Sequence, residues 1–197
     1  MTSKNSRSRK QKELKKLTIP VNIGSDHIRG SVNNAPITLV EYGDYECPYT
    51  GMAYPIVKEI MREFGDKMYF VFRNFPLNDI HPHAQNAAEA AEAAAAQDKF
   101  WKMHDYLFEH QKALDDGHLL EYAQKVGLKD IRKFKDDISG HVYAPLIEES
   151  LKGGIDSGVE GTPTFFINGV LYKDSWDLKT LSQTLHKSIW PHRHSKK

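Results

Sequence analysis

The residue of this chain best suited to nucleophilic chemistry is Cys47, which lies in the sequence Glu46-Cys47-Pro48-Tyr49-Thr50. A cysteine thiolate is a strong nucleophile that attacks disulfides and other electrophiles. The chain has one cysteine among its 197 residues, so no second thiol of the same chain can pair with it. The residue types therefore indicate a reactive thiol without an internal disulfide partner.

The segments around Cys47 predict that it stands at the start of a helix. Residues 36–42 are β-branched and apolar and predict a strand, and residues 43–46 favour a turn. Pro48 suits the first position of a helix, and apolar residues follow at helical spacing: Tyr54, Val57, Ile60, Met61 and Phe64. Free backbone N–H groups and the helix dipole favour an anion at the N-cap, and hence the thiolate.

Two observations oppose this interpretation of Cys47. Asp44 and Glu46 are negatively charged neighbours, which disfavour a second negative charge. A lone cysteine can also be a small buried apolar side chain with no chemical role.

Composition and charge limit the possible partners of the protein and its possible location in the cell. The net charge is only +1, which does not favour nucleic acid as a partner. Residues 1–16 are rich in Lys, Arg and Ser, and they lack the apolar segment of a secretory signal. No run approaches the ~18 apolar residues of a membrane helix. We therefore expect a cytoplasmic protein without a membrane span and with a basic tail at each end.

Along the rest of the chain, the spacing of apolar residues alternates between patterns typical of strands and of helices. Residues 67–75 predict a second strand, so the helix after Cys47 connects two parallel strands and begins at the carboxyl edge of the sheet. Open α/β sheets place their chemistry at that edge. A helical region follows, with expected helices at 83–97, 98–111, 118–126, 130–138 and 142–151.

Strand patterns return after the helical region. Asn168-Gly169 separates two apolar runs and predicts a type I′ hairpin. Pro163 stands before the first of these strands, where its missing N–H is tolerated, and the residues alone leave its isomer open. Residues 177–188 predict a final helix.

His81 and His83 flank Pro82 at the entrance to the helical region. Two such histidines could ligate a metal, but no further cysteine or histidine cluster completes a set. We expect no metal site and interpret both residues as turn or helix contacts.

Three segments, 40–49, 72–77 and 161–169, together resemble the DsbA family of thioredoxin-fold proteins, and the resemblance extends over about residues 26–185. It implies an α/β, thioredoxin-like fold with an inserted all-helical domain. The expected parts are a basic tail (1–25), the first part of the core (26–80), the helical insertion (81–155), the second part of the core (156–189) and a basic tail (190–197).

The resemblance also implies the site. Cys47 is the nucleophile, and Thr162-Pro163 forms a cis-proline loop that faces it and holds the substrate backbone. Pro48 and Tyr49 are expected to contact substrate as well. The chain departs from the family at Thr50, where redox-active relatives usually have a second cysteine. We expect Thr50 to donate a hydrogen bond to the thiolate instead.

The missing second cysteine shapes the expected function. Cys47 can form a mixed disulfide, but an external thiol must resolve it. The leading hypothesis is a monothiol thiol–disulfide oxidoreductase acting on thiol- or disulfide-containing proteins or peptides, with no bound cofactor and glutathione as co-substrate. The alternatives are a non-redox module that binds an extended peptide beside Pro163, and a glutathione-dependent transferase or isomerase.

Overall fold

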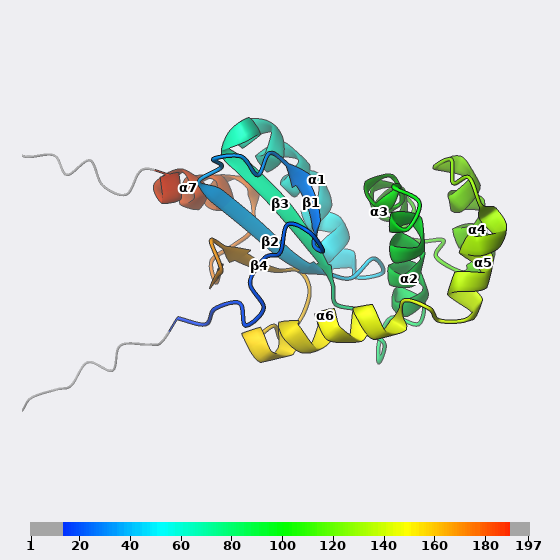
Figure 1. The fold of residues 1–197 in the computed structure, drawn as a ribbon. Coiled ribbons are helices and arrows are strands. Elements are labelled where there is room, and N and C mark those ends of the chain that lie inside the picture. Colours follow the sequence, from blue (N-terminus) through cyan, green and yellow to red (C-terminus); the bar gives the residue numbers. More distant parts are fainter. Residues whose placement is uncertain (1–13, 190–197) are drawn as a thin grey trace, which may run out of the picture.

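The computed structural model describes residues 14–189, and a five-stranded mixed sheet lies at its centre (Figure 1). The strand order is β1-β3-β2-β4-β5. Strands β2 and β3 are parallel, and the other neighbours are antiparallel. The strands are β1 (His27–Gly30), β2 (Ile37–Gly43), β3 (Met68–Asn74), β4 (Thr164–Ile167) and β5 (Val170–Leu171). This arrangement confirms the expected thioredoxin-like α/β fold.

Helix α1 (Pro48–Phe64) connects β2 to β3, as the sequence predicts, and a short 3₁₀ turn η1 (Gly65–Lys67) precedes β3. Cys47 is the N-cap of α1 and Pro48 its first residue. The helix buries one stripe of apolar side chains in the core beside the strands: Ala53, Val57, Ile60 and Phe64. The start of α1 therefore lies at the carboxyl edge of β2.

The C-terminal part of the fold is a hairpin followed by a helix. Asn168 and Gly169 both have positive φ, 49° and 77°, which confirms the predicted type I′ turn between β4 and β5. Helix α7 (Leu178–Ile189) buries Leu181 and Leu185 and packs beside α1. The predicted final helix is confirmed.

Five helices separate β3 from β4. They are α2 (Ala84–Ala95), α3 (Phe100–Glu109), α4 (Asp116–Lys125), α5 (Ile131–Ser139) and α6 (Ala144–Ser157). The alanine-rich α2 packs against all four of the others, because small side chains allow close approach. Helix α6 is longer than expected and continues from the insertion along the sheet, where it packs against β3 (Figure 1).

The two faces of the sheet carry separate clusters of buried side chains. Leu39 and Phe165 belong to the larger cluster, which includes the stripe of α1 and the apolar side chains of the insertion. Their neighbours Val40 and Phe166 point the other way and pack with Phe75. This alternation follows the period of two along each strand.

Residues 15–26, which we call the N-terminal strap, bind to the fold. Lys16 forms an antiparallel bridge with Val170, and the N–H of Leu17 donates to the carbonyl of Gly169 at 2.9 Å. The expectation of a tail as far as residue 25 is therefore wrong for this part. The basic composition did not reveal that β5 offers an unpaired edge, which the strap covers. Residues 1–13 and the predicted tail 190–197 lie outside the described residues.

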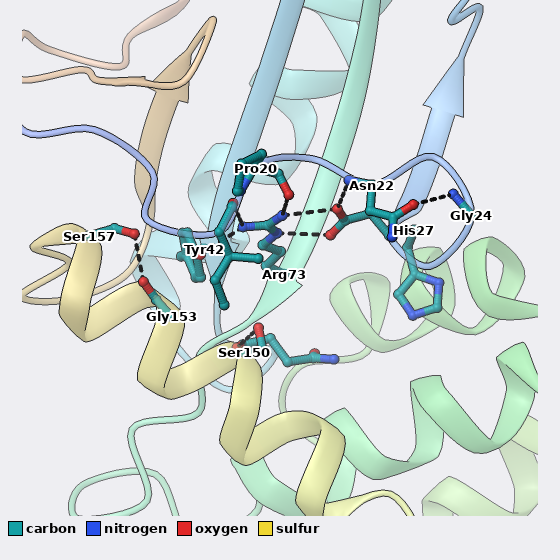
Figure 2. Close-up of polar contacts among 12 residues, drawn as sticks. Pro20, Asn22, Gly24, His27, Tyr42, Arg73, Ser150, Gly153 and Ser157 are labelled. Carbon is teal, nitrogen blue, oxygen red and sulfur yellow. Dashed lines mark hydrogen bonds and ion pairs between the residues drawn. The ribbon is translucent and has the colours of Figure 1, made fainter.

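A buried arginine at the end of β3 holds the strap in place. Arg73 forms a bidentate ion pair with Asp26 at 2.8 and 2.9 Å, and it donates to the carbonyls of Ile19 and Pro20 (Figure 2). It also donates to the Tyr42 hydroxyl at 3.0 Å. Figure 2 shows the Arg73 side chain beside Pro20 and Tyr42. Arg73 thus links the strap to the central strands.

We expect Arg73→Met to lower the free energy of unfolding by about 3 kcal/mol, because removal of one partner of a buried ion pair leaves the other charge unpaired. Urea denaturation measures this change. Arg132→Met is the matched control, since the Arg132 side chain is 93 % exposed and its pair with Asp136 spans 3.9 Å. Equal effects of the two substitutions would contradict a stabilising role of Arg73.

Candidate active site

Cys47 lies where β2 passes into α1, and its thiol is in contact with a distant loop. The Cys47 Sγ donates a hydrogen bond to the carbonyl oxygen of Thr162 at 3.3 Å, although the two residues are 115 positions apart. Thr162 and Pro163 are joined by a cis peptide bond and immediately precede β4. The predicted nucleophile and the predicted proline loop thus lie side by side.

The pairing of β2 with β4 explains this contact. The strands are antiparallel, and Tyr42 near the end of β2 is opposite Thr164 at the start of β4. The loop that leaves β2 and the loop that enters β4 are therefore at the same edge of the sheet.

Cys47 is more buried than its expected role as a reachable nucleophile suggests. Only 3 % of the residue is exposed. Its neighbour Tyr49 is 63 % exposed, as is most of Met52 on the same helix. The predicted contact residue Tyr49 is therefore open to a partner, whereas the sulfur is covered.

Thr50 is placed differently from the expectation. The Thr50 hydroxyl accepts a hydrogen bond from the backbone N–H of Asp44 at 3.4 Å, and no hydrogen bond to Cys47 occurs among the described residues. The side chain is completely buried and points back toward the loop, with its methyl group against Gly43. The expectation that Thr50 donates a hydrogen bond to the thiolate is therefore wrong, because the Thr50 hydroxyl lies beside the loop that precedes the helix.

The two acidic residues near Cys47 have partners that the sequence did not reveal. Asp44 is buried, and one of its oxygens lies 2.7 Å from Nδ1 of His81 and accepts the N–H of Leu77. Glu46 accepts the N–H of His83 at 2.6 Å, just before α2. These bonds tie the loop before α1 to the segment that leads into the insertion.

His81 and His83 serve as structural contacts in this arrangement. No group of three or more His, Cys, Asp or Glu side chains that could hold a metal ion occurs in residues 14–189. The ring of His81 contacts the Asp44 carboxylate, and the backbone N–H of His83 donates to Glu46.

A cleft runs along the other side of the proline loop. It has a volume of about 550 Å³, and its walls include Thr162, Pro163, Phe165, Tyr172 and Trp176. The hydroxyl of Thr162 is buried without a hydrogen-bond partner. The loop thus presents an unpaired polar group and an adjoining cavity.

Glu41 is a candidate that the sequence reasoning missed. It lies on β2, ahead of residues 44–47, which we call the Cys47 loop. The residue is 3 % exposed, and its Oε1 has no hydrogen-bond partner. Burial holds the pKa of this carboxyl well above its ordinary value. The available signal was a single acidic residue inside an apolar strand, since buried acids are rare without a partner.

We expect Glu41→Gln to remove a pH dependence of stability. With its pKa raised, Glu41 keeps its proton in the folded state while the unfolded chain releases it above about pH 4.3. The free energy of unfolding therefore falls as the pH rises from the pKa of the unfolded chain toward the raised pKa of the folded protein, with a slope of at most about 1.4 kcal/mol per pH unit. Urea denaturation between pH 4 and 8 should show that the advantage of Glu41→Gln over the parent protein increases with pH.

The control for this experiment is Glu148→Gln, which changes an exposed glutamate on α6. A constant difference between Glu41→Gln and the parent at all pH values would show that Glu41 is ionised in the folded protein.

Comparison with known proteins supplies the wider context of this site. A family model described as thioredoxin matches residues 23–187. The oxidised BdbD of Bacillus subtilis superposes with a TM-score of 0.75 at 25 % identity, covering 85 % of this chain and 95 % of that one. Wolbachia pipientis alpha-DsbA1 superposes with a TM-score of 0.73 at 22 % identity, covering 88 % and 96 %.

Curated relatives carry a different name. A protein of Salinispora arenicola named Na(+)/H(+) antiporter NhaA 1 is 46 % identical over 166 residues, which is 84 % of this chain and 25 % of the relative. A protein of the same name from Mycobacterium sp. strain KMS is 42 % identical over 171 residues, 86 % of this chain and 28 % of the relative. The chain thus spans about a quarter of their length. Within its described part, no helix is long and apolar enough to cross a membrane.

Proposed function

Because the chain belongs to the thioredoxin family, with DsbA-like thiol–disulfide oxidoreductases among its structural neighbours, we propose that it exchanges disulfides through Cys47 alone. The contact between the Cys47 thiol and the carbonyl of Thr162, beside cis-Pro163, carries this proposal. It places the sulfur at a helix N-cap and next to a loop that can hold a substrate backbone. The chain offers no second cysteine, so the cycle needs an external thiol.

The proposed reaction has three exchange steps. The Cys47 thiolate attacks one sulfur of a substrate disulfide, so that the substrate S–S bond breaks, a mixed disulfide forms between Cys47 and that sulfur, and the other substrate sulfur is displaced as a thiolate that takes up a proton. A glutathione thiolate then attacks the Cys47 sulfur, so that the mixed disulfide breaks, the reduced substrate leaves and Cys47 becomes glutathionylated. A second glutathione reduces the resulting glutathionylated product. In sum, one substrate disulfide is reduced and two glutathione molecules become one glutathione disulfide.

The surroundings of the sulfur support a substrate that approaches along the proline loop. The thiol proton is engaged with the Thr162 carbonyl, so it must leave before the sulfur attacks. Thr162 also has an unpaired buried hydroxyl, and the cleft beside Pro163 can take a side chain of an extended peptide. Pro48 and Tyr49 are exposed at the start of α1 and can contact such a substrate.

A second candidate function is a peptide-binding module without a redox cycle. The 3 % exposure of Cys47 favours it, because a covered sulfur is reached only if the surrounding groups move. The cleft beside Pro163 serves either function, so reactivity of the thiol distinguishes them.

We expect the parent protein to gain one glutathionyl group when it is incubated with oxidised glutathione, and Cys47→Ala to gain none. Intact-mass spectrometry under native conditions measures this. Addition of reduced glutathione should then restore the original mass, because the external thiol resolves the mixed disulfide. A parent protein that stays unmodified while native, but reacts once unfolded in urea, would support the peptide-binding module instead.

We expect Thr50→Cys to form a reversible internal disulfide with Cys47, because the new thiol stands in the first turn of α1 near the N-cap. Mass spectrometry after alkylation of free thiols, with and without a reductant, should show loss of both free thiols in the oxidised variant. The double variant Cys47→Ala/Thr50→Cys is the control and should keep one free thiol. Persistence of two free thiols after oxidation would show that the buried position of residue 50 prevents closure.

A further inference from the structure

A glutamine of the helical insertion binds two backbone carbonyl groups of the Cys47 loop. Gln111 follows α3, and its Nε2 donates to the carbonyl oxygen of Tyr45 at 2.7 Å and to that of Cys47 at 3.1 Å. The side chain is half-buried. One amide group thus connects the insertion to the residue that carries the thiol.

The first turn of α1 leaves room for this amide. A Cβ added at Gly51 would clash with Oε1 of Gln111, so any larger residue at position 51 displaces the glutamine. The N–H of Gly51 donates to the same Cys47 carbonyl at 3.0 Å. The Cys47 carbonyl therefore accepts two hydrogen bonds, one from its own helix and one from the insertion.

Two hydrogen bonds attach α3, the helix that precedes Gln111, to the core. The Tyr45 hydroxyl meets Nδ1 of His104 on α3 at 3.1 Å. Near the end of the same helix, Glu109 accepts the hydroxyl of Tyr54 on α1 at 3.1 Å. Because α3 is fixed to both the loop and α1, the amide of Gln111 is presented at a defined position.

These contacts have an electrostatic consequence for the sulfur. Carbonyl oxygens carry partial negative charge, and two of them belong to the short loop that bears the thiol. A donor that satisfies both oxygens reduces their negative potential and keeps their peptide planes from rotating toward the sulfur. We propose that Gln111 is a positioning residue for Cys47, acting through the carbonyls of Tyr45 and Cys47. This inference rests on the proposed function of Cys47 as the nucleophile.

The test compares Gln111→Met, which keeps the length of the side chain without a donor, with the parent protein. We expect alkylation of Cys47 by iodoacetamide to become about tenfold slower at neutral pH, the effect of losing a hydrogen bond of ordinary strength. The pH profile of alkylation should also move to higher pH, because the thiolate loses favourable surroundings. Gln111→Glu should be slower than Gln111→Met, since a carboxylate repels both carbonyls and the thiolate.

Gly51→Ala provides a second, independent variant. It should slow alkylation to the same extent by displacing Gln111, and Gly51→Ala combined with Gln111→Met should be no slower than either single variant. Gln124→Met, a change of an exposed glutamine on α4, is the matched control and should behave as the parent. Circular dichroism checks folding, and if Gln111→Met does not fold, the result for Gly51→Ala decides.

The outcomes separate this inference from the function on which it depends. Unchanged alkylation rates and pH profiles in Gln111→Met and Gly51→Ala would overturn the positioning role, even if the parent protein forms a mixed disulfide with glutathione. If the parent forms no mixed disulfide, the proposed function fails, whereas slower alkylation in both variants would still establish the coupling of Gln111 to the thiol.

Discussion

The antiparallel pairing of β2 with β4 is the constraint on which the candidate site depends. It aligns Tyr42 with Thr164 and so brings the loop after one strand to the loop before the other. The thiol of Cys47 and the carbonyl of Thr162 meet only because of this register. A shift of one residue would turn each β4 side chain to the opposite face and remove the apolar contacts that stabilise the pairing.

The second constraint is the attachment of the insertion to the Cys47 loop. Asp44 and Glu46 accept hydrogen bonds from the segment before α2, and Gln111 donates to the loop from beyond α3. The helical insertion is therefore part of the environment of the sulfur. This attachment also explains why the loop tolerates two acidic residues beside a candidate thiolate: their charges face donors, which reduces their effect on the sulfur.

Sequence patterns were sufficient where the cause was local. Pro48 after Cys47 predicted the start of α1, and Asn168-Gly169 predicted the β4–β5 turn, because proline and glycine restrict or permit backbone angles within one or two residues. They failed where the cause was distant. The short strand β1 (His27–Gly30) and the strap both depend on pairing with strands elsewhere in the chain, so their own residues carry little signal.

The sequence by itself determined the order of the elements from β2 to α7, the position of Cys47 at a helix N-terminus and the lack of a second thiol, because each follows from residue type and local spacing. Only the tertiary structure decided that Cys47 is covered, that the Thr50 hydroxyl bonds to Asp44, and that Glu41 and Gln111 lie at the site. Burial and hydrogen bonding between remote segments arise when the chain packs. They depend on which surfaces lose water together, and no local pattern records that.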